Sequence, residues 1–332
     1  MNEPLIPEVP VTAPEPPGDG LPVLVPRIRE EVGRVFLGQT AVLDQVIAAL
    51  LAGGHVLLEG KPGLGKTQLV LALARTFGGA FRRIQFTPDL MPSDVTGFTM
   101  FDMATQTFQV RRGPVFTNLL LADEINRAPA KTQAALLEVM QERQVTIDGE
   151  SHLLPPPFMT LATQNPIEHE GTYPLPEAQL DRFLMKILID YPGNEEEQEI
   201  VRRASSVGDL LKAEQLGILA TPEQVVALQQ QTLALAVDPS VIAYAVALVA
   251  ATRESRALAL GAGTRGGISL VRTAKAFAVL AGRDFVIPDD VKAAALPVLR
   301  HRVQLTPEVT ISGQGIDEII LTVVESVPAP RA

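Results

Sequence analysis

Residues 60–67 read GKPGLGKT, and this stretch constrains the fold more than any other part of the chain. It follows the short apolar run HVLLE and precedes QLVLALARTF, whose apolar spacing is typical of a helix. The spacing of the two glycines, the lysine and the threonine is that of a phosphate-binding loop between a buried strand and a helix. A glycine-rich turn that binds nothing is the alternative, and the order of strand, loop and helix argues against it. The stretch therefore predicts a bound nucleoside triphosphate.

The chemistry of this loop follows from its residue types. Glycine adopts backbone angles that other residues resist, so backbone N–H groups can turn inward and surround an anion. The N-terminus of the following helix adds its positive dipole end. We expect Lys66 to reach the β- and γ-phosphates of ATP and the Thr67 hydroxyl to bind Mg²⁺. The residues expected to contact the nucleotide here are Gly60, Pro62, Gly63, Leu64, Gly65, Lys66, Thr67 and Gln68.

A second apolar run, LLLADE, ends in two acids at Asp123 and Glu124. Open α/β sheets bind ligands at the carboxyl ends of their strands, so both acids are expected beside the phosphates. Asp123 would hold Mg²⁺, and Glu124 would orient or deprotonate the attacking water. A kinase would not need the second acid, whereas a hydrolase does. The alternative is an exposed acidic turn.

A third apolar run ends in the amide of Asn165, in the stretch LATQNP. Asn165 is expected either to position the water and contact the γ-phosphate or merely to cap a turn before the proline.

Composition limits the class of protein. The chain has 332 residues, enough for about two domains, with no apolar stretch long enough to span a membrane and no evident signal peptide. It has no cysteine, which excludes disulfides and is compatible with a cytoplasmic protein. The net charge of −10 and the lack of a basic, aromatic-rich stripe argue against nucleic acid as a partner. Four scattered histidines lack metal-ligand spacing and are interpreted as structural or surface residues.

The order of patterns predicts an α/β fold, with a parallel sheet flanked by helices and followed by an all-helical domain. Strands are expected at residues 55–59, 82–86, 118–122, 158–163 and 184–190, with helices at 66–77 and 130–141. Later helices are expected near 194–206, 222–234, 239–255, 267–282 and 288–300, with no strand among them. The expected divisions are a flexible proline-rich tail (1–26), the nucleotide-binding core (27–192), the helical domain (193–320) and a C-terminal tail (321–332).

Two interruptions within the core predict hairpins, one between residues 96 and 112 and one between 144 and 153. Asp148-Gly149 is a strong tight-turn signal between β-rich flanks in the second. Each is either an edge hairpin that extends the sheet or a protruding functional loop.

The stretches GKPGLGKT, LLLADEINRAPAKTQAALLEVMQERQVTIDG, ATQNP and GTYPLPEAQLDRF together closely resemble the MoxR group of AAA+ ATPases. The resemblance runs from about Val35 to about Arg302. It implies an AAA+ αβα core with a helical lid, and subunits in a ring, usually a hexamer, with ATP between neighbours. The two hairpins match that clade's helix-2 insert and pre-sensor-1 insert.

The resemblance also implies roles for single residues. Asn165 matches the sensor-1 residue, and Arg182 matches the arginine finger donated to the next subunit. Arg265 matches the sensor-2 arginine of the lid, which reaches the γ-phosphate in the same chain. The run around it reads GAGTR where the family usually has GASPR, which leaves Arg272 as a second candidate. From the residues alone, the favoured alternatives are that Arg182 pairs with Glu177 or Asp181 on its own surface and that Arg265 is a solvated loop residue.

Gly38-Gln39 separates two helical patterns, and the family's placement of base contacts puts these two residues beside the adenine. A plain turn between helices is the alternative.

The function implied is Mg²⁺-dependent ATP hydrolysis by a ring that remodels proteins. Relatives resemble chaperones that mature enzyme complexes and usually work with a partner carrying a von Willebrand factor A domain. One alternative is a nucleotide-gated assembly switch with incidental turnover. The other is a DNA motor, which the acidic composition disfavours.

Overall fold

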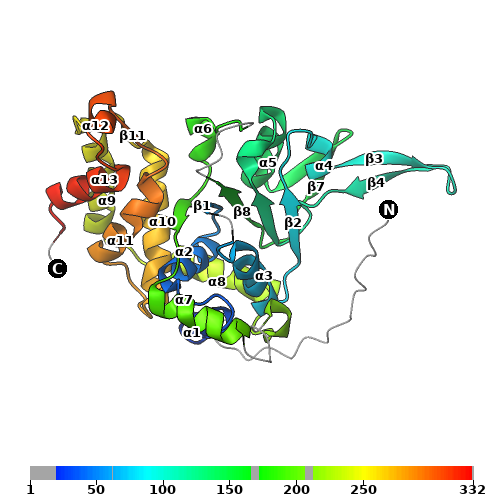
Figure 1. The fold of residues 1–332 in the computed structure, drawn as a ribbon, viewed down its shortest axis with the longest axis horizontal. Helices are drawn as coiled ribbons and strands as arrows, with labels where there is room; N and C mark the ends of the chain where they lie inside the picture. Colours follow the sequence, from blue (N-terminus) through cyan, green and yellow to red (C-terminus); the bar gives the residue numbers. More distant parts are fainter. Residues whose placement is uncertain (1–19, 62, 166–171, 206–211, 331–332) are drawn as a thin grey trace.

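The computed structural model describes residues 20–61, 63–165, 172–205 and 212–330. Its centre is a sheet of five parallel strands in the order β2-β5-β8-β1-β9, with the lid helices to one side (Figure 1). The strands are β1 (Val56–Gly60), β2 (Phe81–Gln85), β5 (Leu119–Asp123), β8 (Met159–Gln164) and β9 (Met185–Ile189). Each coincides closely with an expected strand, so the predicted α/β core is confirmed.

Two layers of helices cover the sheet because alternate strand residues face opposite sides. Leu58, Leu119 and Leu121 pack in the cluster that includes α1 (Leu21–Gly33), α2 (Thr40–Leu51) and α3 (Lys66–Thr76). Leu57 and Leu120 pack in the other cluster with α5 (Ala130–Glu142). The short helices α4 (Pro92–Thr96) and α6 (Glu177–Leu180) and the single turn Ile125–Arg127 complete this layer. The run of adjacent leucines is therefore buried on both faces.

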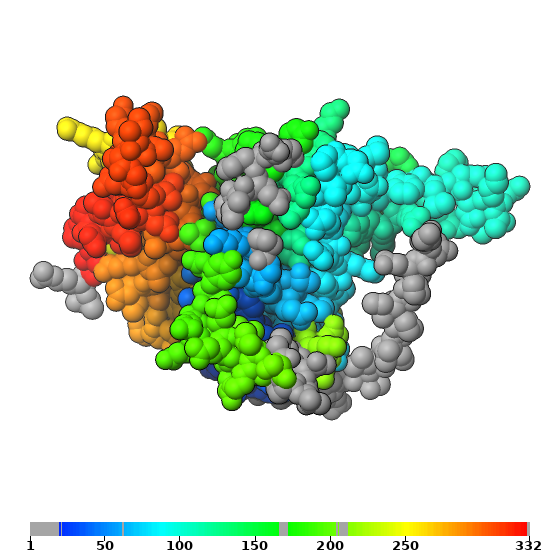
Figure 2. Space-filling model, viewed as in Figure 1, coloured from blue at the N-terminus to red at the C-terminus, as the bar shows by residue number. Residues whose placement is uncertain are grey.

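Both expected hairpins are present, and neither extends the sheet. β3 (Gly97–Asp102) pairs only with β4 (Thr107–Arg112), and β6 (Gln144–Ile147) pairs only with β7 (Glu150–Leu153). Asp148 and Gly149 both have positive φ, as a two-residue hairpin turn requires. The β3–β4 hairpin stands well clear of the body (Figures 1 and 2). The edge-hairpin alternative is therefore wrong for both.

The five later helices expected from the sequence are all present: α7 (Asn194–Ser205), α8 (Pro222–Ala234), α9 (Pro239–Glu254), α10 (Thr264–Leu280) and α11 (Pro288–Leu299). Helices α12 (Pro307–Ile311) and α13 (Ile316–Ser326) and the turn Ala213–Gln215 were not expected. The expectation of no strand is also wrong, because β10 (Leu258–Leu260) pairs with β11 (Gln304–Leu305). Strands of two or three residues are too short to show a period.

The two tail boundaries need correction. α1 begins at Leu21, with proline in its first turn, and Leu24 and Val25 are buried, so the core starts before residue 27. Proline is common in the first turn of a helix. The prolines at the start of α1 were therefore wrongly assigned to the tail, which made the expected tail too long. At the other end α13 continues to Ser326 and buries Val323 and Val324. Residues 1–19 lie outside the described part of the chain, within which no helix is long and apolar enough to cross a membrane.

We expect the β3–β4 hairpin to contribute little to stability, because none of its residues belongs to either buried cluster. Replacing residues 99–110 by Asn-Gly closes the hairpin next to the Phe98–Arg111 pair. The melting temperature of this variant should stay within about 3 °C of the parent. Val95→Ala is the matched control: the fully buried Val95 lies just before the hairpin, and its truncation should cost about 2 kcal/mol. A larger loss from the hairpin replacement than from Val95→Ala would contradict this assignment.

Candidate active site

The loop after β1 has the backbone of an anion-binding cradle. Gly63 and Gly65 have φ of +82° and +75°, values that favour glycine, and Gly65 is the residue on which α3 starts. A Cβ at Gly60 would lie 2.3 Å from the carbonyl oxygen of Ile189 in the neighbouring strand. Gly60 therefore holds the loop close to the sheet, and any side chain there would push the cradle away.

Lys66 begins α3 and turns back over the loop. Its ammonium group donates a hydrogen bond to the Gly60 carbonyl at 2.5 Å. Burial lowers the pKa of Lys66, and the carboxylates of Asp123, Glu124 and Glu59 oppose this shift. Lys66 thus brings a partly desolvated positive charge, which interacts more strongly with a phosphate than a fully solvated one.

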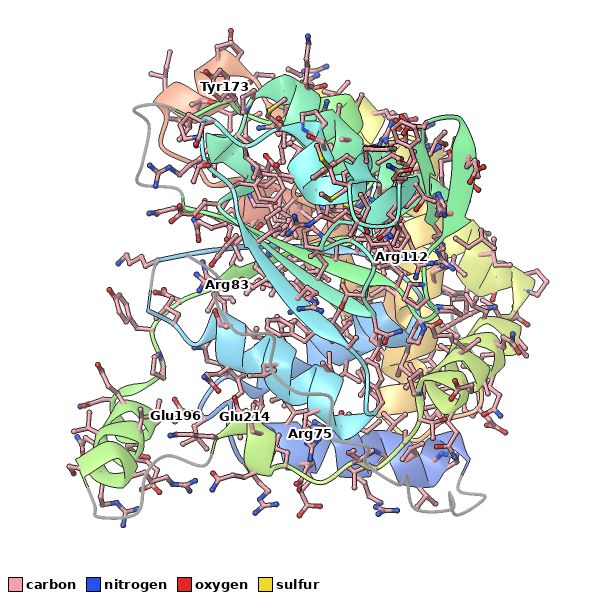
Figure 3. The ribbon with its side chains drawn as sticks, turned by 90° about the vertical axis from the view of Figure 1, so that its right-hand side faces the viewer. Arg75, Arg83, Arg112, Tyr173, Glu196 and Glu214 are labelled. Atoms are coloured by element: carbon pink, nitrogen blue, oxygen red, sulfur yellow. The ribbon has the colours of Figure 1, made fainter. Side chains whose placement is uncertain are left out.

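Asp123 ends β5 and is held on both carboxylate oxygens. The Thr163 hydroxyl donates to Oδ1 at 2.6 Å, and Arg83 donates to Oδ2 through Nε at 3.0 Å and Nη2 at 2.6 Å. Arg83 reaches it from β2, the adjacent strand (Figure 3). Oδ1 keeps a second lone pair for a cation, because a carboxylate oxygen has about two acceptor sites.

Glu124 lies one residue beyond the strand, in the left-handed region with φ of +55° and ψ of +50°. Its N–H donates to the Thr163 hydroxyl at 2.8 Å, and its Oε2 accepts from Gln85 at 2.6 Å and from Arg127 at 3.2 Å. A non-glycine residue with positive φ is held by its surroundings at some cost in free energy. Here that backbone turns the carboxylate away from the strand direction and toward the phosphate cradle.

These groups line one cavity of about 260 Å³ at the carboxyl ends of β1, β5 and β8. Its predicted members are Gly60, Gly63, Leu64, Gly65, Lys66, Thr67, Gln68, Asp123, Glu124 and Asn165. Pro62 lies outside the described residues. The sequence prediction that the strand ends and the loop meet is thus reproduced in space, and Asn165 faces the same cavity from the end of β8.

Gly38 and Gln39 lie beside this cavity and do not line it. Gly38 has φ of +76° and packs against Pro192 and Glu196, where a Cβ would lie 2.8 Å from that of Glu196. The Gln39 side-chain oxygen is buried and has no hydrogen-bond partner among the residues that the structure describes. Phe36 bridges the two places, because its ring lies 3.6 Å from the position of a Cβ on Gly65. An amide oxygen left unpaired in this way fits a ligand with N–H groups, as an adenine base has.

The residues present fit a nucleoside triphosphate with a magnesium ion. The loop offers N–H groups and Lys66 to the phosphates, and the Thr67 hydroxyl and Asp123 carboxylate are the oxygen donors that Mg²⁺ prefers. In the described part of the chain, no cluster of three or more His, Cys, Asp or Glu residues is built to hold a metal alone. A magnesium ion here would therefore share its ligands with phosphate oxygens, as is usual for nucleotide sites.

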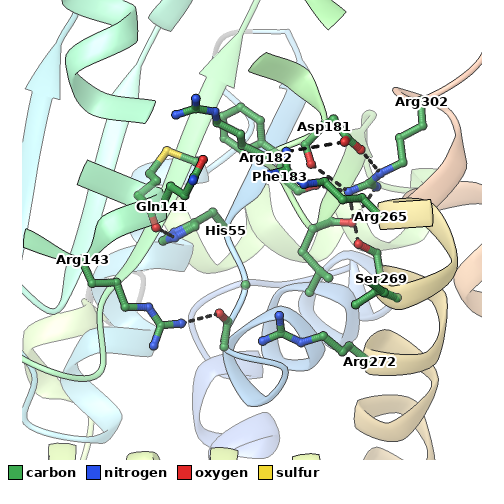
Figure 4. A pocket seen from close by; sticks show the side chains of 15 residues that line it. His55, Gln141, Arg143, Asp181, Arg182, Phe183, Arg265, Ser269, Arg272 and Arg302 are labelled. Atoms are coloured by element: carbon green, nitrogen blue, oxygen red, sulfur yellow. Dashed lines mark hydrogen bonds and ion pairs between the residues drawn. The ribbon is translucent and has the colours of Figure 1, made fainter. Parts of the chain in front are cut away.

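The three arginines implied by the resemblance lie elsewhere. Arg182, Arg265 and Arg272 line a cavity of about 340 Å³ that also includes residues 53–55 and 183–184, just before β1 and β9 (Figure 4). This is the amino-terminal edge of the parallel sheet, the opposite edge from the phosphate cradle. The expectation that Arg265 reaches the γ-phosphate of its own chain is therefore corrected. The alternative, Arg272, lies in the same second cavity.

Hydrogen bonds and ion pairs orient the arginine side chains that line this pocket. Arg302 is buried and donates to Asp181 Oδ1 at 2.8 Å, and Arg265 lies 3.7 Å from Asp181 Oδ2. Arg182 donates to the Leu137 carbonyl at 2.8 Å, and Arg272 donates to the Ala52 carbonyl at 2.5 Å. The Arg272 Nε is buried and has no partner. Asp181 is the single acid among the described lining residues, so the pocket suits an anion.

The comparisons with known proteins identify the family. A family model described as ATPase family associated with various cellular activities matches residues 55–185, and an AAA lid model matches residues 250–322. The chain is 44% identical to chaperone MoxR1 of Mycobacterium tuberculosis, over 91% of this chain and 81% of that protein. It is 33% identical to protein MoxR of Methylorubrum extorquens, over 92% and 94% of the two chains. The chain belongs to the MoxR family of AAA+ ATPases.

Two further relatives match almost end to end. The chain is 45% identical to the uncharacterised protein YeaC of Bacillus subtilis, over 91% of this chain and 93% of that one. A crystal structure from Cytophaga hutchinsonii, of a protein with a provisional assignment as an ATPase, superposes with a TM-score of 0.87 at 42% identity. That match covers 94% of this MoxR-family chain and 96% of the other.

Sequence reasoning missed four residues that line the cavity in this MoxR-family chain: Arg83, Gln85, Thr163 and Gln164. Thr163 is buried and joins Asp123 to Glu124, and Arg83 pairs with Asp123 from β2. The one sequence signal that could have indicated Thr163 is its hydroxyl near the end of an otherwise apolar strand. Arg83 gave none, because its role depends on β2 lying next to β5.

We expect Thr163→Val to slow ATP turnover on the order of a hundredfold, with a smaller loss of ATP affinity because Thr163 also holds Asp123. Valine keeps the shape but leaves the Glu124 N–H without its acceptor, so the carboxylate loses its position. Steady-state kcat and KM separate the two effects. The matched control is Thr160→Val on the same strand, because the Thr160 hydroxyl is buried without a partner and should be dispensable. Equal effects of the two substitutions would refute the bridging role.

Proposed function

We propose that this MoxR-family chain is a Mg²⁺-dependent ATPase that works as a ring and remodels protein complexes. One observation carries the proposal: the arginines suited to phosphoryl transfer lie at the opposite end of the sheet from the phosphate cradle. Among the described residues that line the cradle, the single arginine is Arg83, which is paired with Asp123. Each site would therefore be completed by a second subunit.

The chain's own residues support hydrolysis in the following way. The loop N–H groups and Lys66 bind the phosphates and fix the γ-phosphorus in place. Asn165 and Glu124 orient a water in line with the bond to be broken, and Glu124 accepts its proton. The water oxygen bonds to the γ-phosphorus as the bond to the β–γ bridging oxygen breaks, which gives ADP and phosphate. Mg²⁺, held by Thr67 and Asp123, would neutralise charge on the β- and γ-phosphates.

Arg182 would act on the nucleotide of the neighbouring subunit, and Arg265 would act beside it. Both line one pocket, in which Asp181 of the core lies beside Arg265 of the lid and the Leu137 carbonyl accepts from Arg182. A guanidinium supplied by a neighbour stabilises charge on the transferring phosphoryl group and can raise the rate about 10³–10⁵-fold. Because Arg265 belongs to the lid, turnover in one subunit would depend on the lid of the next.

Support for a remodelling role comes from relatives, among which MoxR1 is named a chaperone. We propose a hexameric ring, a partner with a von Willebrand factor A domain, a client protein complex and a cytoplasmic location as further parts of this function. Co-purification with the products of neighbouring genes tests the two partners.

Glu124→Gln should keep ATP bound and lower turnover about a hundredfold or more, because the amide keeps the size of the side chain and cannot accept the proton. Binding of a fluorescent ATP analogue and release of phosphate are measured on the same sample. Wild-type turnover by the variant would remove Glu124 from water activation.

Arg182→Ala and Lys66→Ala should each be nearly inactive alone, and an equal mixture should regain activity. In the mixture, about a quarter of the interfaces join an intact loop to an intact arginine if Arg182 acts on its neighbour. The ATPase rate of the mixture is compared with each variant alone, after subunit exchange is verified with labelled chains. No gain despite exchange would show that Arg182 does not act across an interface.

A further inference from the structure

Within the described part of its own subunit, helix α7 makes few contacts beyond that of Glu196 with Gly38. It follows β9, and none of its described side chains is buried. Val201 is 60% exposed. The first turn of the helix has three consecutive acids, of which Glu195 and Glu197 make no ion pair in the described chain. Figure 3 shows the helix that carries Glu196 standing out from the rest of the ribbon. Helices in proteins gain most of their stability by packing one face, so an acidic helix with an exposed valine lacks its packing surface.

A groove with the complementary properties lies between α9 and α10 in the lid. Its volume is about 440 Å³, and its walls include Ile242, Val246 and Ile268, which are 44%, 58% and 55% exposed. Three cations, Arg253, Arg272 and Lys275, also line it, and none of its described lining residues is acidic. Each of these three side chains donates a hydrogen bond to a backbone carbonyl. The groove is thus lined by exposed apolar side chains and by cations, with no acid among its described lining residues.

The two surfaces belong to opposite ends of the sheet. The groove shares Ile268 and Arg272 with the arginine-rich pocket, which lies before β1 and β9. α7 follows the other end of β9, and Glu196 in its first turn packs against Gly38 on the side of the phosphate cradle. Contact between such unlike surfaces joins subunits head to tail, and this kind of contact gives a ring when the rotation between neighbours closes.

We propose that α7 of one subunit docks into the α9–α10 groove of the next copy of this chain. The inference rests on the proposed function, in which Arg182 and Arg265 of the second subunit approach the phosphate cradle of the first. α10 carries both Arg265 and the groove, and at about 1.5 Å per residue Lys275 lies about 15 Å farther along it. When Arg265 of the second subunit approaches the phosphate cradle of the first, the groove of the second subunit therefore faces the side of the first from which α7 projects. Acids of α7 then meet the three cations, and Val201 enters the apolar floor.

The first experiment uses two charge insertions at exposed positions. Val246→Glu alters the groove and Val201→Glu alters α7, and either should shift the ATP-bound protein from its assembled form to monomers, with at least a tenfold loss of ATPase activity. An equal mixture should form dimers and nothing larger, because each pair has one intact groove facing one intact α7. Ile311→Glu is the matched control, since Ile311 is 86% exposed on α12 and outside the groove. Mass photometry reports the assembly, and thermal melts verify folding.

The second experiment uses the absence of cysteine from the chain. Val201→Cys and Val246→Cys proteins, mixed with ATP and Mg²⁺ and treated with a short bis-maleimide, should give a covalent dimer that contains one copy of each. Val201→Cys mixed with Ile311→Cys should give none.

The outcomes separate the inference from the function on which it rests. Wild-type protein that stays monomeric with ATP and Mg²⁺ would overturn both. Wild-type rings together with equally good rings of Val246→Glu and no Val201–Val246 crosslink would overturn the inference alone. The groove would then be free for another occupant.

Discussion

Parallel pairing of the five central strands decides where each functional group of this chain lies. Because all five strands run the same way, their carboxyl ends meet at one edge and their amino ends at the other. The phosphate loop, Asp123 and Thr163 are brought together at the first edge, and Arg182 lies just before β9 at the second. A strand of opposite direction at β9 would place the arginine in its own phosphate cavity. The sheet thus separates the two halves of the expected phosphoryl-transfer machinery within one chain.

Within the phosphate cavity, buried hydrogen bonds set the geometry more than charge does. Thr163 fixes both acids at the end of β5 through one hydroxyl, which donates to Asp123 and accepts from the Glu124 backbone. Such a bond is strong because the hydroxyl has almost no exposure to water. Arg83 balances the charge of Asp123, so the two adjacent carboxylates do not both face the cavity unopposed. Gln85 and Arg127 hold Glu124 through Oε2, which leaves Oε1 for the proposed role in accepting a proton.

The lid links this chemistry to assembly. α10 carries Arg265 in its first turn, forms one wall of the apolar groove and packs against α2 and α11. A force on the groove from a neighbouring subunit would therefore act on the same helix that carries Arg265. Docking of α7 and completion of the active site by arginine would then be two parts of one interface between subunits. Through that interface, the nucleotide state and the ring geometry could influence each other.

The sequence by itself determined the strands of the central sheet, the longer helices and the candidate phosphate site. Runs such as Leu119–Leu121 are apolar without alternation, and GKPGLGKT has the spacing of a phosphate-binding loop, so local pattern sufficed to predict the sheet, the loop and the acids. Only the tertiary structure decided which strands are neighbours, and therefore that Arg83 and Thr163 hold Asp123. It also decided that Arg265 lies with Arg182 at the far edge. These facts depend on contacts between residues up to more than eighty positions apart, such as Arg265 and Asp181. Periodicity within a segment carries no information about such contacts, because it reports which face is buried and not what covers it.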